Sequence, residues 1–278
     1  MVRHSKFVHD KNESYALYKR PRNALIIYLK LTNQEAAQFI SASDFIKNID
    51  FIIKKKEEVY FNSNDFHDFI FKAENLNNHV ENRQNYIHFN RYFLNFLNSW
   101  RIYIDFLEAF VKKLMNDEFE RFKKETNKLF DTNFTYRFLY NLRNYSEHIS
   151  YPIQIILANN AGSKFEPLFI RNELLMHESM KPKHFKNDYK LLNEIFPVLP
   201  HMTEGLNLLE YIEKIFFGLF RNKIIESINQ IDSLIKEDNI CLGIKRPNSD
   251  LVDIQGFDRK ILYLIKEKTG FFNENRRN

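Results

Sequence analysis

The chain has 278 residues, which is long enough to bury a sizeable core in one large domain or two modest ones. It contains only 6 Gly and 7 Pro against 28 Phe and 14 Tyr, so helix breakers are scarce and bulky apolar residues are common. The net charge of +5 is compatible with a polyanionic partner such as RNA. The single cysteine excludes an intrachain disulfide and a cysteine-based zinc site, and it fits a reducing compartment.

The chain shows no pattern typical of export, membrane insertion or nucleotide binding. Its first residues lack the apolar core of a signal peptide, and no run approaches the roughly 18 uninterrupted apolar residues of a membrane span. The motifs GxxxxGK[ST], GxGxxG and GxSxG are absent, which removes the commonest nucleotide-binding and serine-hydrolase functions. We therefore expect a cytoplasmic protein that has no membrane association and no cofactor.

The first third of the chain divides into four stretches. Residues 1–22 are polar and basic, and we predict a solvated arm. Residues 24–31 form a short apolar run, which indicates either a strand or the start of a buried helix. From Asn33 the apolar spacing is helical, and the stripe ends at Ile52 before a charged run. Residues 62–85 are rich in Asn, Asp and His, and we predict a connection with one short helix.

The strongest helical signal lies at residues 84–114, where apolar residues alternate steps of four and three without a break. An aromatic stripe of this kind is core far more often than a platform for stacking bases. Later periodic stretches predict helices at 117–130, 203–236 and 250–269, with a loop at 237–250. We therefore predict a mainly α fold.

One β-prone segment interrupts the helices. After Pro152 the sequence IQIILAN favours a strand, and residues 159–162 favour a turn. Residues 167–175 supply a partner strand, so we predict a small β-hairpin inserted after the preceding helix. Residues 177–200 contain three prolines and are predicted to be irregular.

The stretch YRFLYNLRNYSEHISYP, residues 136–152, combines one apolar helix face with two polar stripes. The first polar stripe contains Arg137, Asn141, Asn144 and His148, and the second contains Tyr136, Tyr140, Arg143 and Glu147. Asn144 lies one turn before His148, near enough to hydrogen-bond the imidazole or share its ligand. Glu147 lies one turn after Arg143, near enough to form an ion pair with it.

Arg143 and His148 bring together a permanent cation and a titratable imidazole. On an ideal helix these two residues lie about 140° apart, which is too far for a shared face. A common site therefore requires the helix to loosen near Pro152, or a second copy of the helix to face the first across a two-fold axis.

The spacing of this pair is weak evidence by itself, because an arginine and a histidine with four to six residues between them occur four times. The four pairs are Arg3/His9, Arg83/His88, Arg143/His148 and Arg171/His177. Only Arg143/His148 lies late in a well-framed amphipathic helix that a proline follows. The setting of the pair, more than its spacing, singles it out.

This motif resembles the signature of the HEPN superfamily of ribonucleases. In that family an arginine, a polar residue and a histidine lie on a helix of a compact bundle, and two copies meet at a dimer interface. The chain matches at Arg143, Asn144 and His148, and the Pro-Ile pair that begins at Pro152 is similar to HEPN-like proteins of bacterial defence and abortive-infection systems. The resemblance is close over about twenty residues and loose over 84–236. It implies a HEPN-like bundle of long antiparallel helices.

The resemblance implies a metal-independent endoribonuclease that works as a homodimer in phage defence or growth arrest. RNA is the expected substrate, with an antitoxin or a defence-system protein as a further partner. Arg143 and His148 are the expected catalytic residues. Asn144, Glu147 and Tyr140 are expected to support them, and Arg137 and Asn141 are expected to contact RNA. No histidine–carboxylate spacing matches a helical zinc motif, so no metal site is expected.

The same resemblance divides the chain into an accessory segment at 1–80, a HEPN-like core at 81–240 and a C-terminal helix with a tail at 241–278. Two other functions remain open. The first is a non-catalytic helical module of the same fold that binds RNA or protein. The second is a scaffold in which Arg143 and His148 only form hydrogen bonds at the surface or at an interface.

Overall fold

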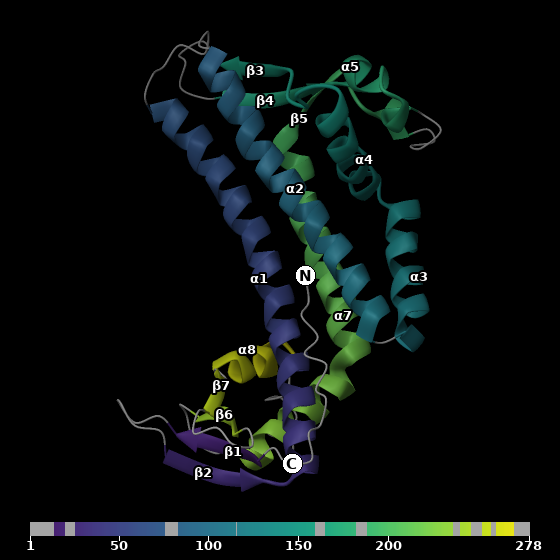
Figure 1. The fold of residues 1–278 in the computed structure, drawn as a ribbon. Coiled ribbons are helices and arrows are strands. Elements are labelled where there is room, and N and C mark those ends of the chain that lie inside the picture. The colour runs from purple at the N-terminus through teal and green to yellow at the C-terminus, as the bar shows by residue number, and fades with distance from the viewer. Residues whose placement is uncertain are drawn as a thin grey trace. The chain divides into compact units, whose positions relative to one another are not determined.

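The computed structural model describes residues 14–19, 26–75, 83–114, 116–158, 165–181, 188–235, 240–245, 252–256 and 260–269. Its architecture is mainly α, as predicted (Figure 1). The chain forms two compact units, a central unit at Ile52–Leu219 and a terminal unit made of Met1–Phe51 and Phe220–Asn278. The terminal unit joins the two ends of the chain, so it cuts across the predicted divisions at 80/81 and 240/241.

The central unit is built around long helices. They are α1 (Asn33–Asn75), α2 (Arg83–Leu114), α3 (Asn116–Thr132), α4 (Phe134–His148) and α7 (Val198–Leu234), of which α1 and α7 also contribute residues to the terminal unit. Shorter elements of the central unit are α5 (Arg171–Leu175), η1 (Glu178–Met180) and η2 (Asp188–Leu191). The predicted helix at 84–114 is confirmed as α2, and its aromatic stripe is core.

The region predicted as a connection at 62–85 is instead mostly helix, because α1 continues to Asn75. Its buried residues Phe66 and Ile70 keep the helical spacing, and the abundant Asn, Asp and His residues occupy mainly the exposed face. The Phe66 ring packs against the rings of Phe89 and Phe93 on α2, at centroid distances of 6.2 and 6.0 Å. Polar composition suggested a loop, whereas the sparse apolar residues were sufficient for a packed helix.

An antiparallel sheet follows α4 in the chain, as predicted. Strand β3 (Ile155–Ala158) pairs with β4 (Phe165–Ile170), and β4 pairs in turn with β5 (Ile195–Pro197). The third strand and the early start of α7 at Val198 lie within the region predicted to be irregular. Pro200 is tolerated there because it occupies the first turn of α7, where backbone N–H groups have no helical acceptor.

The terminal unit contains a four-stranded antiparallel sheet that the sequence did not predict. Its strand order is β2 (Ile26–Leu31), β1 (Ser14–Lys19), β6 (Ile240–Lys245) and β7 (Val252–Gly256). The predictions of a solvated arm, a loop and a long final helix are therefore wrong at these strands. Only α8 (Lys260–Lys268) remains of that helix, and Lys266 Nζ pairs with Asp232 on α7 at 2.5 Å.

Strand β1 pairs with β6 across more than 200 residues of sequence, from Tyr15 opposite Ile244 to Lys19 opposite Ile240. Tyr15 and Leu17 are buried. Strand β1 also pairs with β2, which follows it closely in the chain, so the pairing with β6 is the part of this sheet that the local sequence does not indicate.

A close approach of α7 to α2 and α4 holds the middle of the central unit together. The indole Nε1–H of Trp100 donates to the Gly205 carbonyl at 2.9 Å. A Cβ atom at Gly205 would lie 2.6 Å from Cδ1 of Leu139, so a larger residue there would require the end of the Leu139 side chain to shift. The contact fixes the inner face of α4. The Arg143/His148 motif lies on this same helix.

His201 on α7 packs against α4 in a largely aromatic environment. Its ring lies 5.1 Å from that of Phe138 and 5.5 Å from that of Phe196, and its Nδ1 lies 3.1 Å from Thr135 Oγ1. Burial lowers the pKa of His201 to about 4, while the Glu204 carboxylate acts in the opposite direction.

We expect His201 to make the folded state less stable in mild acid. Because its folded pKa is about 4 and its unfolded pKa about 6.5, only the unfolded chain takes up this proton between those values. The free energy of unfolding should therefore fall by about 2 kcal/mol from pH 7 to pH 5 through this group. Urea unfolding at both pH values measures the effect, and His201→Gln should remove most of it. An equal fall in that variant would assign the acid sensitivity to other groups.

Candidate functional site

The motif helix α4 lies antiparallel to α2 (Figure 1). The Asn90 side chain near the start of α2 donates to the Ile153 carbonyl and accepts from the Ile153 N–H, both at 3.0 Å. Ten residues further along α2, the Trp100 ring contacts the ring of Tyr136 near the start of α4. At its own N-terminus α4 is capped by Asn133, whose side chain accepts from the Tyr136 N–H at 2.8 Å. Both ends of α4 are therefore held by specific contacts.

Arg143 is half-buried on the exposed side of α4 and forms the ion pair that the sequence predicted. Its Nη1 lies 2.5 Å from Oε2 of Glu147, one turn further along the helix. The Nε–H of Arg143 is buried and has no hydrogen-bond partner among the described residues. The guanidinium is thus directed toward the C-terminal end of α4, and its buried Nε–H donor is unused.

His148 is the last residue of α4, and its side chain is exposed. The helix ends at Ile149, whose N–H still donates to the Tyr145 carbonyl at 3.0 Å. Helical hydrogen bonding therefore persists up to the end, and the helix does not loosen to bring His148 toward Arg143. The geometry within one copy keeps the two residues on different sides of the helix.

Exposed apolar side chains surround the end of α4. Ile149 is 55% exposed and Tyr151 is 42% exposed. Met176, 78% exposed, follows α5 and precedes His177, whose ring contacts that of Tyr145 on α4. Exposed apolar side chains grouped in this way are typical of a surface that contacts another protein.

Tyr140, a predicted supporting residue, connects the motif to α2. The guanidinium of Arg101 stacks on the Tyr140 ring at 3.2 Å from its centroid and also donates to the Tyr140 hydroxyl. Arg101 Nε donates to Asp105 at 2.9 Å, in the same i, i+4 arrangement as Arg143 with Glu147. Arg101 has no sequence signal of its own, because Arg101 lies on α2, where the aromatic stripe indicated core.

Arg137 and Asn141, predicted to contact RNA, are instead buried on the inner part of the helix. Arg137 Nη1 donates to the Phe130 carbonyl at 2.6 Å, and Nη2 pairs with Asp188. The Asn141 amide donates back to the Arg137 carbonyl at 2.9 Å. The Arg137 side chain holds α4 against neighbouring segments, whereas Asn141 bonds within the helix, and burial leaves neither available to contact RNA. Asn144 is half-buried one turn before His148, as predicted.

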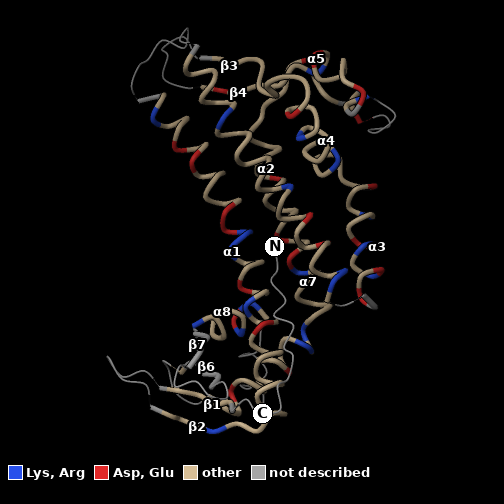
Figure 2. The backbone as a smooth tube through the Cα atoms, viewed as in Figure 1, with Lys and Arg blue, Asp and Glu red and all other residues tan. Residues whose placement is uncertain are grey.

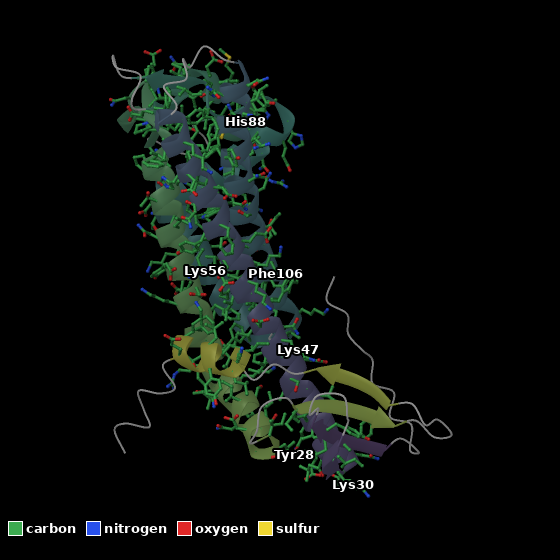
Figure 3. All side chains as sticks on the ribbon, turned by 90° about the vertical axis from the view of Figure 1, so that its left-hand side faces the viewer. Tyr28, Lys30, Lys47, Lys56, His88 and Phe106 are labelled. Atoms are coloured by element: carbon green, nitrogen blue, oxygen red, sulfur yellow. The ribbon has the colours of Figure 1, made fainter. Side chains whose placement is uncertain are left out.

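The other pairs with the same spacing have different surroundings. Arg171 Nη1 donates to the Leu192 carbonyl at 2.7 Å, so this guanidinium joins two backbone segments. His88 on α2 packs its ring 5.7 Å from that of Phe69 on α1 (Figure 3). The pair Arg3/His9 lies outside the described residues. Among the pairs that the structure describes, only Arg143/His148 ends in a histidine at an exposed helix end.

The excess positive charge is not gathered along one helix. Figure 2 shows Lys and Arg interspersed with Asp and Glu along α1 and α3. In the described part of the chain, no cluster of three His, Cys, Asp or Glu side chains is arranged to hold a metal ion. No helix in that part is long and apolar enough to cross a membrane.

Comparison with models of known protein families gave no match, and comparisons with curated proteins and with solved structures gave none either. The residues of α4 and their surroundings are therefore the basis for a function.

Proposed function

We propose that the protein is a metal-independent endoribonuclease of HEPN type that acts as a homodimer. The observation that carries the proposal is the end of α4, where the exposed His148 directly follows the Arg143–Glu147 pair and exposed apolar side chains adjoin it. A role in bacterial phage defence or growth arrest follows from the resemblance of the motif, and an antitoxin or defence-system partner would belong to that role.

The residue types are sufficient for cleavage by attack of the RNA 2′-hydroxyl. One His148 takes the 2′-OH proton as the oxygen forms its bond to the adjacent phosphorus. The P–O5′ bond breaks, and the second copy's His148, in its protonated form, gives a proton to the leaving 5′-oxygen. Arg143 binds the nonbridging oxygens and stabilises the charge of the transition state. The products are a 2′,3′-cyclic phosphate and a 5′-hydroxyl.

Two features of the same region support a dimer. The intact end of α4 leaves Arg143 and His148 on different sides of the helix, so a single copy does not bring them to one phosphate. The exposed side chains of Ile149, Tyr151 and Met176 supply apolar surface beside the motif. A second copy related by a two-fold axis would cover this surface and bring both motifs to one cleft.

A non-catalytic binding module of the same fold is the second candidate. The Arg143–Glu147 ion pair favours it, because the carboxylate occupies part of the guanidinium that the catalytic function requires for phosphate. Such a module would retain RNA affinity and release no cyclic-phosphate ends.

We expect the wild-type protein to cleave a mixed pool of single-stranded RNA in the presence of EDTA. General acid–base chemistry by histidine needs no metal ion, so chelation should leave the rate unchanged within about twofold. Mass spectrometry of the fragments should show 2′,3′-cyclic phosphate and 5′-hydroxyl ends. Fragments that carry 5′-phosphate ends, or cleavage that EDTA abolishes, would contradict the proposed chemistry.

A further inference from the structure

A strip of polar side chains runs between α2 and α4 and ends at Arg143. Arg101 on α2 contacts Tyr140 on α4, as described above. Asn98 lies one turn before Arg101, and Arg143 lies one turn after Tyr140. Because the two helices are antiparallel, both steps go in the same direction. Asn98, Arg101, Tyr140 and Arg143 therefore line one strip, which we call the α2–α4 strip.

Three polar atoms of this strip are buried and lack a hydrogen-bond partner among the described residues. They are Asn98 Oδ1, Arg101 Nη1 and Arg143 Nε. Burying a donor or acceptor without a partner is unfavourable, so such atoms are rare, and three of them along one strip require an explanation. None of the four strip residues is fully buried, and Arg101 keeps 17% and Arg143 32% of the side chain exposed. A ligand at the surface can reach these buried atoms where the exposed carboxylates of Asp105 and Glu147 move aside.

The unused atoms match the chemistry of an RNA strand. Two guanidinium groups offer N–H donors and positive charge, which phosphate oxygens accept in charge-assisted hydrogen bonds. Asn98 Oδ1 is an acceptor, which an isolated phosphate diester cannot satisfy but a 2′-hydroxyl can. The strip thus lacks partners of the two kinds that a ribonucleotide supplies.

The ion pairs already in the strip do not use up this capacity. Asp105 accepts only from Arg101 Nε, and Glu147 pairs with Arg143 through Nη1. Arg101 stays fixed by stacking on Tyr140, so its unused donor is held in place before any ligand arrives. Asp105 is 53% exposed on its side chain, and Glu147 is 36% exposed, so a ligand can displace them at small cost.

We infer that the α2–α4 strip is a substrate subsite, in which Arg101 binds an RNA phosphate next to the one held by Arg143 and Asn98 accepts from a 2′-hydroxyl. This inference rests on the proposed ribonuclease function and adds a second helix to the site. Arg101 is a binding residue in this arrangement, and Tyr140 positions it. The subsite selects RNA over DNA through Asn98.

The test measures binding of a fluorescent single-stranded RNA by the full-length His148→Ala protein, which prevents cleavage during the titration. Adding Arg101→Ala should weaken binding about tenfold, the effect of losing one charge-assisted hydrogen bond. The slope of log affinity against log salt concentration should become shallower by about 0.7, as one phosphate contact is lost. Asn98→Ala should lower the ratio of RNA to DNA affinity, measured with a DNA oligonucleotide of the same sequence.

Arg121→Ala is the matched control, because Arg121 also pairs with a carboxylate on its own helix but is exposed on α3, away from the strip. It should leave the affinity and the salt slope unchanged. If Arg101→Ala lowers the melting temperature strongly, Arg101→Lys replaces it, and binding should still weaken because the planar fork is lost. Equal affinity and equal slope in a folded Arg101 variant, or no RNA binding by the His148→Ala protein at all, would overturn the subsite.

The binding assay and the cleavage assay separate the two proposals. Cleavage by the wild-type protein together with binding that is independent of Arg101 would remove the subsite and keep the nuclease. Binding that depends on Arg101, without cleavage by the wild-type protein, would remove the nuclease and keep the strip as a site for RNA.

Discussion

Alanine at His148 is expected to lower the rate of RNA cleavage by at least about 100-fold, the usual minimum contribution of a general acid–base group. The side chain is exposed at the end of α4, so its removal should change the free energy of unfolding by less than about 0.5 kcal/mol. Cleavage rates at saturating RNA, together with thermal unfolding of the same samples, separate lost chemistry from lost structure. His67→Ala, which removes another exposed histidine from α1, is the control and should retain the wild-type rate.

The same substitution tests whether the site is shared between two copies. Arg143→Ala should also abolish cleavage, because the phosphate then loses its guanidinium. A mixed dimer of the two inactive proteins contains one intact Arg143 and one intact His148 on different helices. Mixing them under conditions of subunit exchange should restore part of the activity if both helices line one cleft. Recovery should be partial, because the mixed dimer retains only one of the two His148 side chains that the mechanism uses. Full inactivity of mixed dimers, isolated by two affinity tags, would show that both His148 side chains are needed or that each copy must supply both residues.

The second large effect is expected at Lys56, which lies on α1 beside α7 in the central unit (Figure 3). Its ammonium group is buried, at 2.7 Å from Glu213 and 2.6 Å from Glu210. Lys56→Met would remove the ammonium group that pairs with the buried Glu213 carboxylate. We expect a loss of about 3–5 kcal/mol in the free energy of unfolding, and a melting temperature lower by about 10 °C.

The surroundings of Lys56 make this loss difficult to compensate. Tyr60 donates to Glu210 at 2.5 Å, and burial together with this acceptor raises the pKa of Tyr60. Tyr103 is fully buried nearby, and its hydroxyl has no hydrogen-bond partner among the described residues. Burial, followed by the charges of Glu213 and Glu210, raises the pKa of Tyr103 well above its usual value, so the phenol stays neutral.

Two further variants identify the cause of the predicted loss. Lys56→Met combined with Glu213→Leu removes both buried charges and should recover most of the stability, since apolar replacements of a buried ion pair are often neutral. Lys55→Met affects an adjacent lysine that pairs with the exposed Glu58, and should cost at most about 1 kcal/mol. A double variant as unstable as Lys56→Met alone would mean that shape, and not unpaired charge, determines the loss.

Much of the helical architecture could be predicted because helical periodicity is local. The stripe at 84–114 corresponds closely to α2, and the hairpin after Pro152 corresponds to β3 and β4. In the four-stranded sheet of the terminal unit only β2 had a local signal, the apolar run at 24–31, whereas β1 and β6 pair across more than 200 residues. The continuation of α1 through 62–75 was also missed, because its apolar residues are few and its composition resembles a loop.

The candidate site divides in the same way. The sequence placed Arg143, Asn144 and His148 on one helix and paired Arg143 with Glu147, because contacts three or four residues apart follow from helix geometry alone. Arg137 looked equivalent to His148 in the same polar stripe, yet it is buried against Asp188, 51 residues further along the chain. Which polar face a helix exposes depends on the elements that pack against it.

The sequence by itself determined a mainly α chain and a helix that ends in an arginine–asparagine–histidine motif. Tertiary structure alone decided that Arg137 and Asn141 are internal and that Arg101 lies beside the motif through Tyr140, 39 residues away. The physical reason is the range of the interactions. Backbone hydrogen bonds and side-chain spacing act within a few residues, whereas burial and ion pairing depend on segments that only the folded chain brings together.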